Sequence, residues 1–539
     1  MKARKELGDV PAENKNDMYF KSLAWLRTDV KVLRKDEIEL LPGLLVPYMA
    51  VIFVGRDHLP FPSLTKTSKA NRINDFHREW LRQHRARMDW QAIINPCYEN
   101  MAWGKVKDGW EKPNRTNAST SDIIFQDIRP AGEYCKIFIQ SKTSDNRRKD
   151  IGGDTWRVYV RGPSSIAATV FDHNNGTYEA LFLIMEPGTY QLLVYLDYSL
   201  CDGFKDPPRD WFIMGNAQGK FQREGLLGFL DDYLVQPLQN GTYFEINVTK
   251  AEINLALDDK LRSLESCPST CNNLWDGFGR WRNDTWRPYL EESYNWSLPA
   301  NHSSSGTFWV YGDSLGVRLY QSISSRALCR KLYSKCKNSY NWLYPVINAA
   351  KSRIENDSLD FRAEEVLKAI RRVLTTTELQ QSSSLLLLNL GLHYTASVNF
   401  TTFQKVISEV INLLKETQVD SQGKEGLMYK AKIIWKSTTA LCKHHGKEFN
   451  PTDSRFLTPQ RVLLFSAYAM SAMCQAGFDV IDVYPMTESY PGGTFAEDVV
   501  HYPDKVFSAL ETLLEKYKVN RIEGIGTDDS KIRIRRCTG

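Results

Sequence analysis

The stretch TFWVYGDS, residues 307–314, decides the fold of the C-terminal part of the chain. Its apolar and β-branched residues up to Tyr311 predict a buried strand, and Gly312 permits a tight turn. Ser314 then opens a helix in LGVRLYQSISSRALCRKL, residues 315–332. A strand that passes at once into a helix is typical of a parallel βα unit.

The same alternation continues toward the C-terminus. Predicted strands are LLLLNL (385–390), AKIIWKSTT (431–439) and FDVIDVYPM (478–486), and predicted helices cover 400–416, 459–477 and 504–518. The uninterrupted apolar run at 385–390 is expected of a strand that is buried on both faces. Residues 301–539 are therefore expected to form a three-layer α/β/α domain with a parallel sheet, whose ligands lie at the carboxyl ends of the strands.

Upstream, the hydrophobic period changes to two. Apolar residues alternate with polar ones in WRVYVRGP (156–163) and YQLLVYLD (190–197), and glycine- or proline-containing turns separate the runs. This pattern predicts an antiparallel β-sandwich over residues 116–200. The stretch from Gly152 to Tyr198 also resembles a filamin-type immunoglobulin repeat, which implies a binding or spacer module.

Composition sets the broad class of protein. The chain has 539 residues, 42% hydrophobic and 25% charged, with 69 basic and 64 acidic residues and a net charge of +5. Whole-chain disorder, a protein with many membrane spans and a nucleic-acid partner are therefore not expected.

Glycosylation sequons indicate the compartment. The Asn-x-Ser/Thr sequons begin at Asn114, Asn117, Asn175, Asn240, Asn247, Asn283, Asn295, Asn301, Asn356 and Asn399. They are about twice as frequent as chance predicts. All of them, and all ten cysteines, follow the apolar run at 40–55. We therefore expect most of the chain to lie in the secretory pathway, either in the Golgi lumen as a type II membrane protein or outside the cell.

The apolar run LLPGLLVPYMAVIFVG (40–55) allows three interpretations. A helix of this length would span about 24 Å, which is short of the hydrocarbon core of about 30 Å. A signal anchor over 40–56, preceded by a cytosolic tail at 1–39, is favoured; a cleaved signal peptide and a buried core segment are the alternatives. The anchor would tie the protein to the membrane through a single N-terminal segment.

Two further segments have open interpretations. Residues 57–115 are expected to be a stem, whose basic and aromatic stretch HREWLRQHRARMDW (77–90) is either a solvated helix, which is favoured, or a contact for a polyanion. Residues 201–300 are expected to be an aromatic linker region. Its Trp275, Trp281, Trp286, Tyr289 and Trp296 either staple the linker to the next domain, which is favoured, or stack on sugar rings.

The spacing of Cys329 and Cys336 can be tested against disulfide geometry. On one continuous helix their Cα atoms would be about 10 Å apart, beyond the limit of about 7 Å for a disulfide. They need other partners or a break in the helix. The segment Cys442-Lys443-His444-His445 has ligand residue types but lacks a second pair at suitable spacing, so no metal site is expected.

Three polar signals fall at predicted strand ends. Gly312-Asp313-Ser314 follows the first strand, Asn389-Leu390-Gly391-Leu392-His393 follows the second, and Asp498-Val499-Val500-His501 precedes the last helix. An aspartate three residues before a histidine can hold the imidazole by Nδ1, so that Nε2 faces a serine. The conjunction predicts a catalytic triad of Ser314, His501 and Asp498.

With these motifs the chain resembles the SGNH, or GDSL-like, hydrolase superfamily, and within it the NXPE family (neurexophilin and PC-esterase domain proteins). WVYGDS, NLGLHY and VYPMTESYPGG…VHYPD carry the resemblance. It implies that Ser314 is the nucleophile, His501 the base and Asp498 its orienter, and that Asn389 and the Ser314 N–H bind the oxyanion. The glycine of the superfamily's second block has no counterpart between 335 and 375, and His393 is either a pocket residue or a buried core histidine.

The resemblance also implies O-acetyl transfer to glycan hydroxyls, sialic acid among them, or removal of such acetyl groups. No bound cofactor is implied, and an acetyl donor such as acetyl-CoA would be a co-substrate. A glycan or glycoprotein is the implied partner. The alternative function is an inactive secreted or membrane-anchored binding or adhesion protein.

Overall fold

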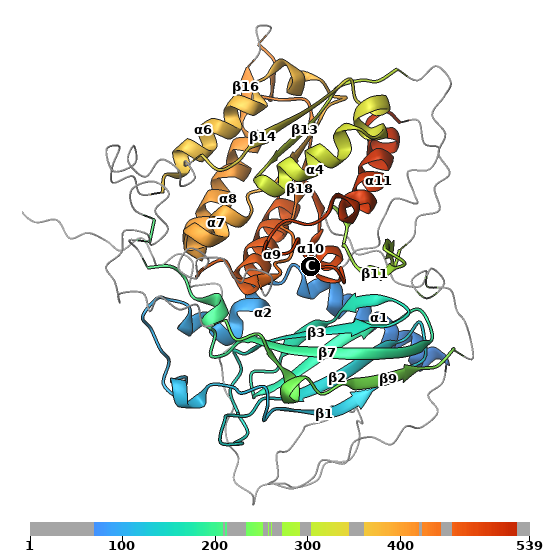
Figure 1. Cartoon of the computed structure of the whole chain (residues 1–539). Helices are drawn as coiled ribbons and strands as arrows, with labels where there is room; N and C mark the ends of the chain where they lie inside the picture. Colours follow the sequence, from blue (N-terminus) through green and yellow to red (C-terminus); the bar gives the residue numbers. More distant parts are fainter. Residues whose placement is uncertain are drawn as a thin grey trace, which may run out of the picture. The chain divides into compact units, whose positions relative to one another are not determined.

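A six-stranded parallel sheet forms the centre of the C-terminal part of the chain (Figure 1). The computed structural model describes residues 69–208, 211–212, 233–251, 257, 260, 272–290, 303–343, 361–419, 423–443 and 455–524. In spatial order the strands are β10 (Asn272–Trp275), β19 (Asp479–Ile481), β18 (Lys432–Lys436), β15 (Leu385–Leu388), β13 (Thr307–Gly312) and β14 (Lys335–Tyr340). All adjacent pairs are parallel.

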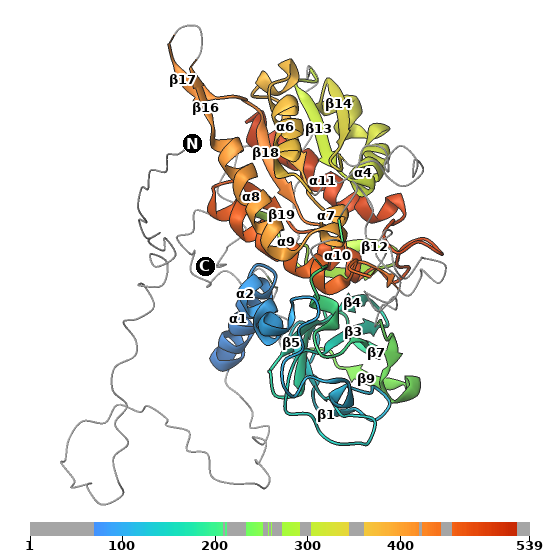
Figure 2. The same ribbon diagram turned by 90° about the vertical axis from the view of Figure 1, so that its left-hand side faces the viewer.

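Helices cover both faces of this sheet (Figures 1 and 2). Helices α4 (Ser314–Ser324) and α11 (Ser508–Tyr517) pack on one face, and α6 (Ala363–Leu374), α8 (Phe400–Lys415) and α9 (Pro459–Gln475) pack on the other. Strand β15 shows the reason, because alternate side chains of a strand point to opposite faces. Its Leu385 and Leu387 join the core under α4 and α11, while Leu386 and Leu388 join the core under α6, α8 and α9. The prediction of a three-layer α/β domain is confirmed.

Two predicted elements end well short of their expected bounds. The helix predicted over 315–332 ends at Ser324, and a separate π-helical turn, η5, covers Leu328–Leu332. The strand predicted over 478–486 ends at Ile481, and Tyr484–Glu488 forms the helix α10. Asp482 accepts a hydrogen bond from the Tyr484 N–H (3.0 Å), and a proline occupies the first turn of α10, which favours a helix start over a longer strand.

A second core lies between two antiparallel sheets, as the period-two pattern predicts. The first sheet has the order β1 (Asp122–Asp127), β2 (Tyr134–Gln140), β6 (Thr177–Leu183) and β5 (Thr169–Asp172). The second has the order β12 (Thr285–Pro288), β11 (Gly279–Arg282), β4 (Ser165–Ala167), β3 (Thr155–Arg161), β7 (Gly188–Tyr198) and β8 (Gln236–Pro237), with β9 (Phe244–Val248) also paired to β7. Trp156, Val158 and Val160 of β3 are buried in this core.

The region 201–300 is less irregular than the sequence indicates. Strands β8, β9, β11 and β12 extend the sandwich beyond residue 200, and β10 completes the parallel sheet. The aromatic residues Trp275, Trp281, Trp286 and Tyr289 are each no more than 7% exposed. Their burial fits the stapling interpretation rather than a sugar-stacking surface. Trp296 lies outside the described residues.

The stretch 77–90 is not a solvated stem. It belongs to α1 (Lys69–Ala86) and to the start of α2 (Trp90–Ile94), and Phe76 and Trp80 of α1 are 4% and 3% exposed. Arg82 forms two hydrogen bonds of 2.7 Å with Glu179 of β6. Arg78, Arg82 and Arg87 of this stretch thus pair with acids of the described fold, which weakens its interpretation as a contact for a polyanion.

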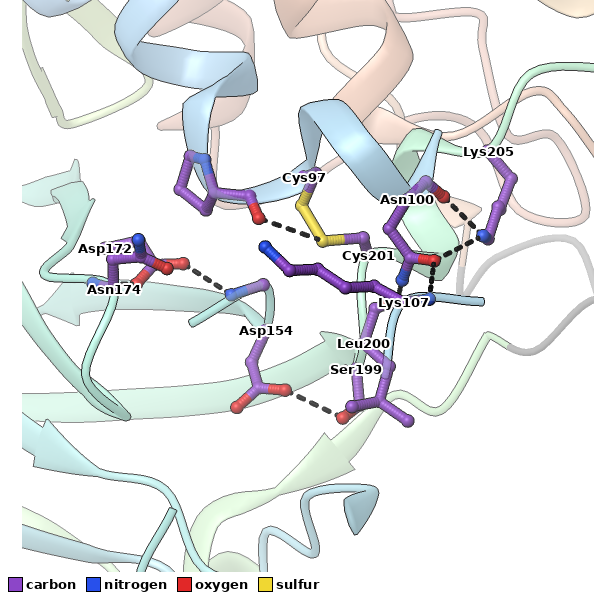
Figure 3. Close-up of a disulfide and its surroundings, with 12 residues drawn as sticks. Cys97, Asn100, Lys107, Asp154, Asp172, Asn174, Ser199, Leu200, Cys201 and Lys205 are labelled. Atoms are coloured by element: carbon purple, nitrogen blue, oxygen red, sulfur yellow. Dashed lines mark hydrogen bonds between the residues drawn. A yellow bond between two sulfur atoms is a disulfide. The ribbon is translucent and has the colours of Figure 1, made fainter. Parts of the chain in front are cut away.

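The cysteines confirm the prediction of disulfides. Cys329 and Cys336 are bonded with a Cα–Cα distance of 5.7 Å, because η5 ends at Leu332 and the chain turns into β14. Cys97 and Cys201 are also bonded, and beside them Lys205 donates to Asn100 Oδ1 at 3.1 Å (Figure 3). Cys474 is disulfide-bonded as well. Among the described cysteines, Cys135 and Cys442 are free.

The predictions for membrane attachment and glycosylation are only partly covered by the structure. The tail at 1–39, the apolar segment at 40–56 and the acceptors Asn295, Asn301 and Asn356 lie outside the described residues. Within those residues, every helix is too short or too polar to cross a membrane. Five of the seven described acceptors are exposed, namely Asn175, Asn240, Asn247, Asn283 and Asn399; Asn114 and Asn117 are half-buried.

Candidate active site

Ser314 lies where β13 passes into α4, at the carboxyl end of the parallel sheet. Asp313 is the N-cap of α4, and its Oδ1 accepts a hydrogen bond from the Leu315 N–H (3.0 Å). Gly312 packs closely on the helix, because a Cβ at this position would meet the Gly316 Cα at 3.2 Å. The turn therefore sets Ser314 at the first position of the helix, where its N–H has no acceptor in the preceding turn.

The three predicted triad residues meet at this point. His501 Nε2 lies 2.8 Å from Ser314 Oγ, and His501 Nδ1 lies 2.7 Å from Asp498 Oδ2. Ser314 and His501 are 187 residues apart in the sequence. Both contacts are within hydrogen-bonding distance, so the order serine, imidazole, carboxylate is in place for proton transfer.

A tight local turn holds the carboxylate of the triad. Asp498 Oδ1 accepts hydrogen bonds from the backbone N–H groups of Val500 (2.8 Å) and His501 (3.1 Å). Partial burial opposes ionisation of Asp498, but these bonds and the His501 side chain outweigh it, so the pKa of Asp498 is lowered. The carboxylate is therefore charged at neutral pH and can fix the orientation of the imidazole.

Asn389 does not have the contacts expected of an oxyanion donor. Its Nδ2 donates to the Lys436 carbonyl at 2.9 Å and to Thr438 Oγ1 at 3.3 Å. Both amide hydrogens are thus used within the fold, and the side chain ties the end of β15 to the end of β18. Its predicted role in binding an oxyanion requires the amide to leave these partners.

Gly391 takes a place beside the serine turn. A Cβ there would meet Asp313 Oδ2 at 2.8 Å and Asn389 Oδ1 at 2.6 Å, so a larger residue does not fit. The next N–H, of Leu392, donates to Asp313 Oδ2 at 3.0 Å. In the described part of the chain, the N–H groups of Ser314 and Gly391 donate to no other residue. These two amides therefore have no acceptor among the described residues.

Strand β14 is followed by an asparagine that the sequence did not single out. Asn341 follows β14, is fully buried, and donates through its N–H to the Gly312 carbonyl (2.9 Å) and through Nδ2 to the Asn389 carbonyl (2.5 Å). It joins the ends of β13 and β15, and it lies within residues 335–375, where the resemblance seen in the sequence implies a glycine. The polar strand KCKNSY gave no apolar signal, because β14 is at the edge of the sheet.

His393 lines the site instead of lying in the core. Its Nε2 is 2.8 Å from the Tyr340 hydroxyl, and its ring stacks on Trp342 with 5.2 Å between centroids. Burial lowers the pKa of His393; the charge of Asp313 opposes this shift and the nearby His501 adds to it. The imidazole is therefore neutral at neutral pH. Tyr340 is 41% exposed, so this group forms an aromatic wall that solvent can reach.

Comparison with known proteins does not assign the chain to a family. No model of a protein family matches the chain, and no curated protein matches it. Among solved structures, one similar chain is described as "Crystal structure of the Lin-41 filamin domain". The two are 18% identical, the match covers 15% of this chain and 80% of that one, and the TM-score is 0.14.

The site has the parts needed for nucleophilic catalysis. It provides a serine hydroxyl, an imidazole that can accept its proton, a charged carboxylate behind the imidazole, and two free backbone donors. Within the described residues, no group of three or more His, Cys, Asp or Glu side chains is arranged to hold a metal ion. His444 and His445 lie outside those residues.

Proposed function

We propose that the chain is a serine-dependent enzyme that transfers an acyl group, acetyl in particular, to or from the hydroxyl groups of glycans. The observation that carries the proposal is the relay of hydrogen bonds from Ser314 through His501 to Asp498, at 2.8 and 2.7 Å. This relay matches the roles of nucleophile, general base and orienting acid in acyl transfer.

In the first half-reaction Ser314 Oγ attacks the carbonyl carbon of the acyl donor and gives its proton to His501 Nε2. The carbonyl oxygen becomes an oxyanion. Collapse of the tetrahedral intermediate breaks the bond to the leaving group, which takes the proton back from His501. The acyl group remains as an ester on Ser314.

In the second half-reaction an acceptor hydroxyl gives its proton to His501 and attacks the ester carbon. Collapse then returns the proton to Ser314 Oγ and releases the acylated acceptor. A sugar hydroxyl as acceptor gives transfer, whereas water gives hydrolysis. The same residues serve both outcomes.

We assign the oxyanion to the backbone N–H groups of Ser314 and Gly391. Two observations support this assignment. Neither N–H has an acceptor among the described residues, and Gly391 packs closely against Asp313. Asn389 would contribute only after releasing Lys436 and Thr438. Loss of one such donor typically lowers the rate by about 10²–10³.

We further propose that the α/β part is an SGNH-like, PC-esterase domain, and that the chain has the layout of the NXPE family. The motifs GDS and D-x-x-H at opposite ends of the domain support this assignment, and their side chains meet. The disulfides Cys97–Cys201 and Cys329–Cys336 support an oxidising, secretory compartment. A glycan partner fits that compartment.

A serine-reactive fluorophosphonate tests the proposal on the purified full-length chain. We expect labelling of the native chain and of the Ser324→Ala control, which removes an exposed hydroxyl from the same helix. We expect Ser314→Ala to lose labelling and to lower turnover of an aryl acetate by about 10³-fold or more. Equal labelling of Ser314→Ala and the native chain would remove Ser314 as nucleophile and favour a binding protein.

A further inference from the structure

The helix that carries Ser314 also places a cation beside it. Arg318 follows Ser314 by four residues in α4, and residues at this spacing lie on the same side of a helix, about 5–6 Å apart at Cβ. Both side chains are half-buried, whereas Leu315 and Leu319 of the same helix are buried in the core. Arg318 therefore lies at the rim of the site.

The guanidinium extends toward the loop of the catalytic histidine. Its Cζ is 5.6 Å from the ring centroid of Phe495, a residue that is 40% exposed. The Phe495 N–H in turn donates to the His501 carbonyl at 2.9 Å. Arg318 thus extends from the helix of the nucleophile to a partly exposed aromatic ring in the loop that bonds to His501.

Arg318 is also unpaired in the part of the chain that the structure describes. No carboxylate within those residues forms an ion pair with it, whereas Arg326, just beyond the same helix, pairs with Glu511 at 2.5 Å. The carboxylate of the triad, Asp498, is bonded to His501. Within the described residues, the charge of Arg318 is therefore not neutralised by an ion pair.

We propose that Arg318 binds an anionic group of the substrate next to the acyl centre. The inference rests on the proposed function and deepens it by naming the substrate class. A planar guanidinium binds a carboxylate or a phosphate through two parallel hydrogen bonds. The anion belongs either to an acidic sugar that accepts the acyl group or to a phosphate-bearing acyl donor, and both sources share this chemistry.

The test measures equilibrium binding to the full-length chain, so that it does not depend on turnover. One pair of probes is the methyl glycoside of an acidic sugar, glucuronic or N-acetylneuraminic acid, and its carboxyl methyl ester, which differ in a single charge. The second pair is 4′-phosphopantetheine and pantetheine, which differ in a single phosphate group. Each is titrated into the native chain, Arg318→Gln, Arg318→Lys and the control Arg372→Gln, which removes an exposed arginine from α6.

We expect the native chain and Arg372→Gln to bind one charged probe about 10-fold more tightly than its uncharged partner. Arg318→Gln should reduce the ratio of the two dissociation constants to about 1, and Arg318→Lys should retain part of the preference for the charged probe. If Arg318→Gln loses the preference for the charged sugar, the acceptor is the source of the anion. If it loses the preference for the phosphorylated pantetheine, the donor is the source.

If Arg318→Gln keeps the ratios of the native chain, or if the native chain shows no preference in either pair, the inference is wrong. Failure of fluorophosphonate to label Ser314 is a separate result. It would remove the proposed function, while the binding ratios would still report on the anion site.

Discussion

In the proposed mechanism, Ser314 becomes reactive through its neighbours rather than through its own chemistry. A free serine hydroxyl is a weak nucleophile, and here it lies 2.8 Å from an imidazole whose other nitrogen is held by Asp498. Asp498 is oriented by two backbone N–H groups of its own turn. The chemistry thus depends on a few well-placed hydrogen bonds.

Substitution of Asp498 by asparagine tests this arrangement. The amide would be similar in size but would favour the wrong tautomer of His501, so kcat should fall by roughly 10³–10⁴. Because the pKa of Asp498 is lowered, its carboxylate stays charged from pH 8 down to pH 5, and the loss should be of similar size across that range. Rates with an aryl acetate over this range provide the check; Glu497→Gln, an exposed neighbour, is the control.

The lowered pKa of Asp498 also has a consequence for stability. A carboxyl with a lower pKa in the folded state stabilises the fold above its unfolded pKa, and this contribution is lost as the pH falls through the folded value. The free energy of unfolding should therefore fall more between neutral and acid pH in the native chain than in Asp498→Asn. Equal acid sensitivity of the two chains would contradict this account.

At the scale of elements, α1 shows how an apolar pair within a charged helix decides its packing. Phe76 and Trp80 lie one turn apart and enter a core with Tyr134 and Leu181 of the sandwich. Arg82 extends this contact through its pair with Glu179. The helix is thus attached to the sandwich by apolar burial, with the ion pair at its edge.

Trp80→Ala should therefore destabilise the chain. Truncation of a buried tryptophan typically costs about 3–5 kcal/mol in free energy of unfolding. Chemical denaturation followed by circular dichroism would measure the change. Asn74→Ala, at an exposed position of the same helix, should change it by about 0.5 kcal/mol or less. A loss for Trp80→Ala as small as that of the control would show that α1 is not docked in this way.

At the scale of the whole molecule, an ion pair joins the N-terminal helices to the end of the parallel sheet. The described residues all belong to one compact unit, Lys66–Gly539. Arg87, after α1, donates to Asp482, after β19, at 2.7 and 3.1 Å, and both side chains are buried. Asp482 also accepts from Ser437 Oγ at 2.7 Å, after β18. The segment before the sandwich is therefore part of the architecture of the α/β domain.

Asp482→Asn should remove the charge that compensates Arg87. Removal of one partner of a buried ion pair typically costs about 3–5 kcal/mol, because the other charge is left in a poorly solvated site. The matched control is Glu416→Gln, which breaks the exposed pair with Arg371 and should leave the free energy of unfolding nearly unchanged. Thermal unfolding of both variants checks the difference. Similar midpoints for the two would contradict the burial of the Arg87 pair.

The sequence alone was sufficient for the features that repeat locally. The apolar run at Leu385–Leu388 and the helical spacing in Phe400–Lys415 report burial within a few residues, and both elements form as predicted. The candidate triad could be predicted because GDS and D-x-x-H are short motifs placed by the order of strands and helices. Periodicity shows that a face is buried, and short motifs show which side chains are available.

Only the tertiary structure decided which surfaces and strand ends meet. Asn341 had no sequence signal because its partners, Gly312 and Asn389, come from two other strands. The packing of α1, the place of β10 in the parallel sheet and the turn that joins Cys329 to Cys336 have the same origin. Each depends on contacts or on a chain reversal that local composition does not encode. Many different surfaces could bury the same apolar face, and only the whole fold selects one of them.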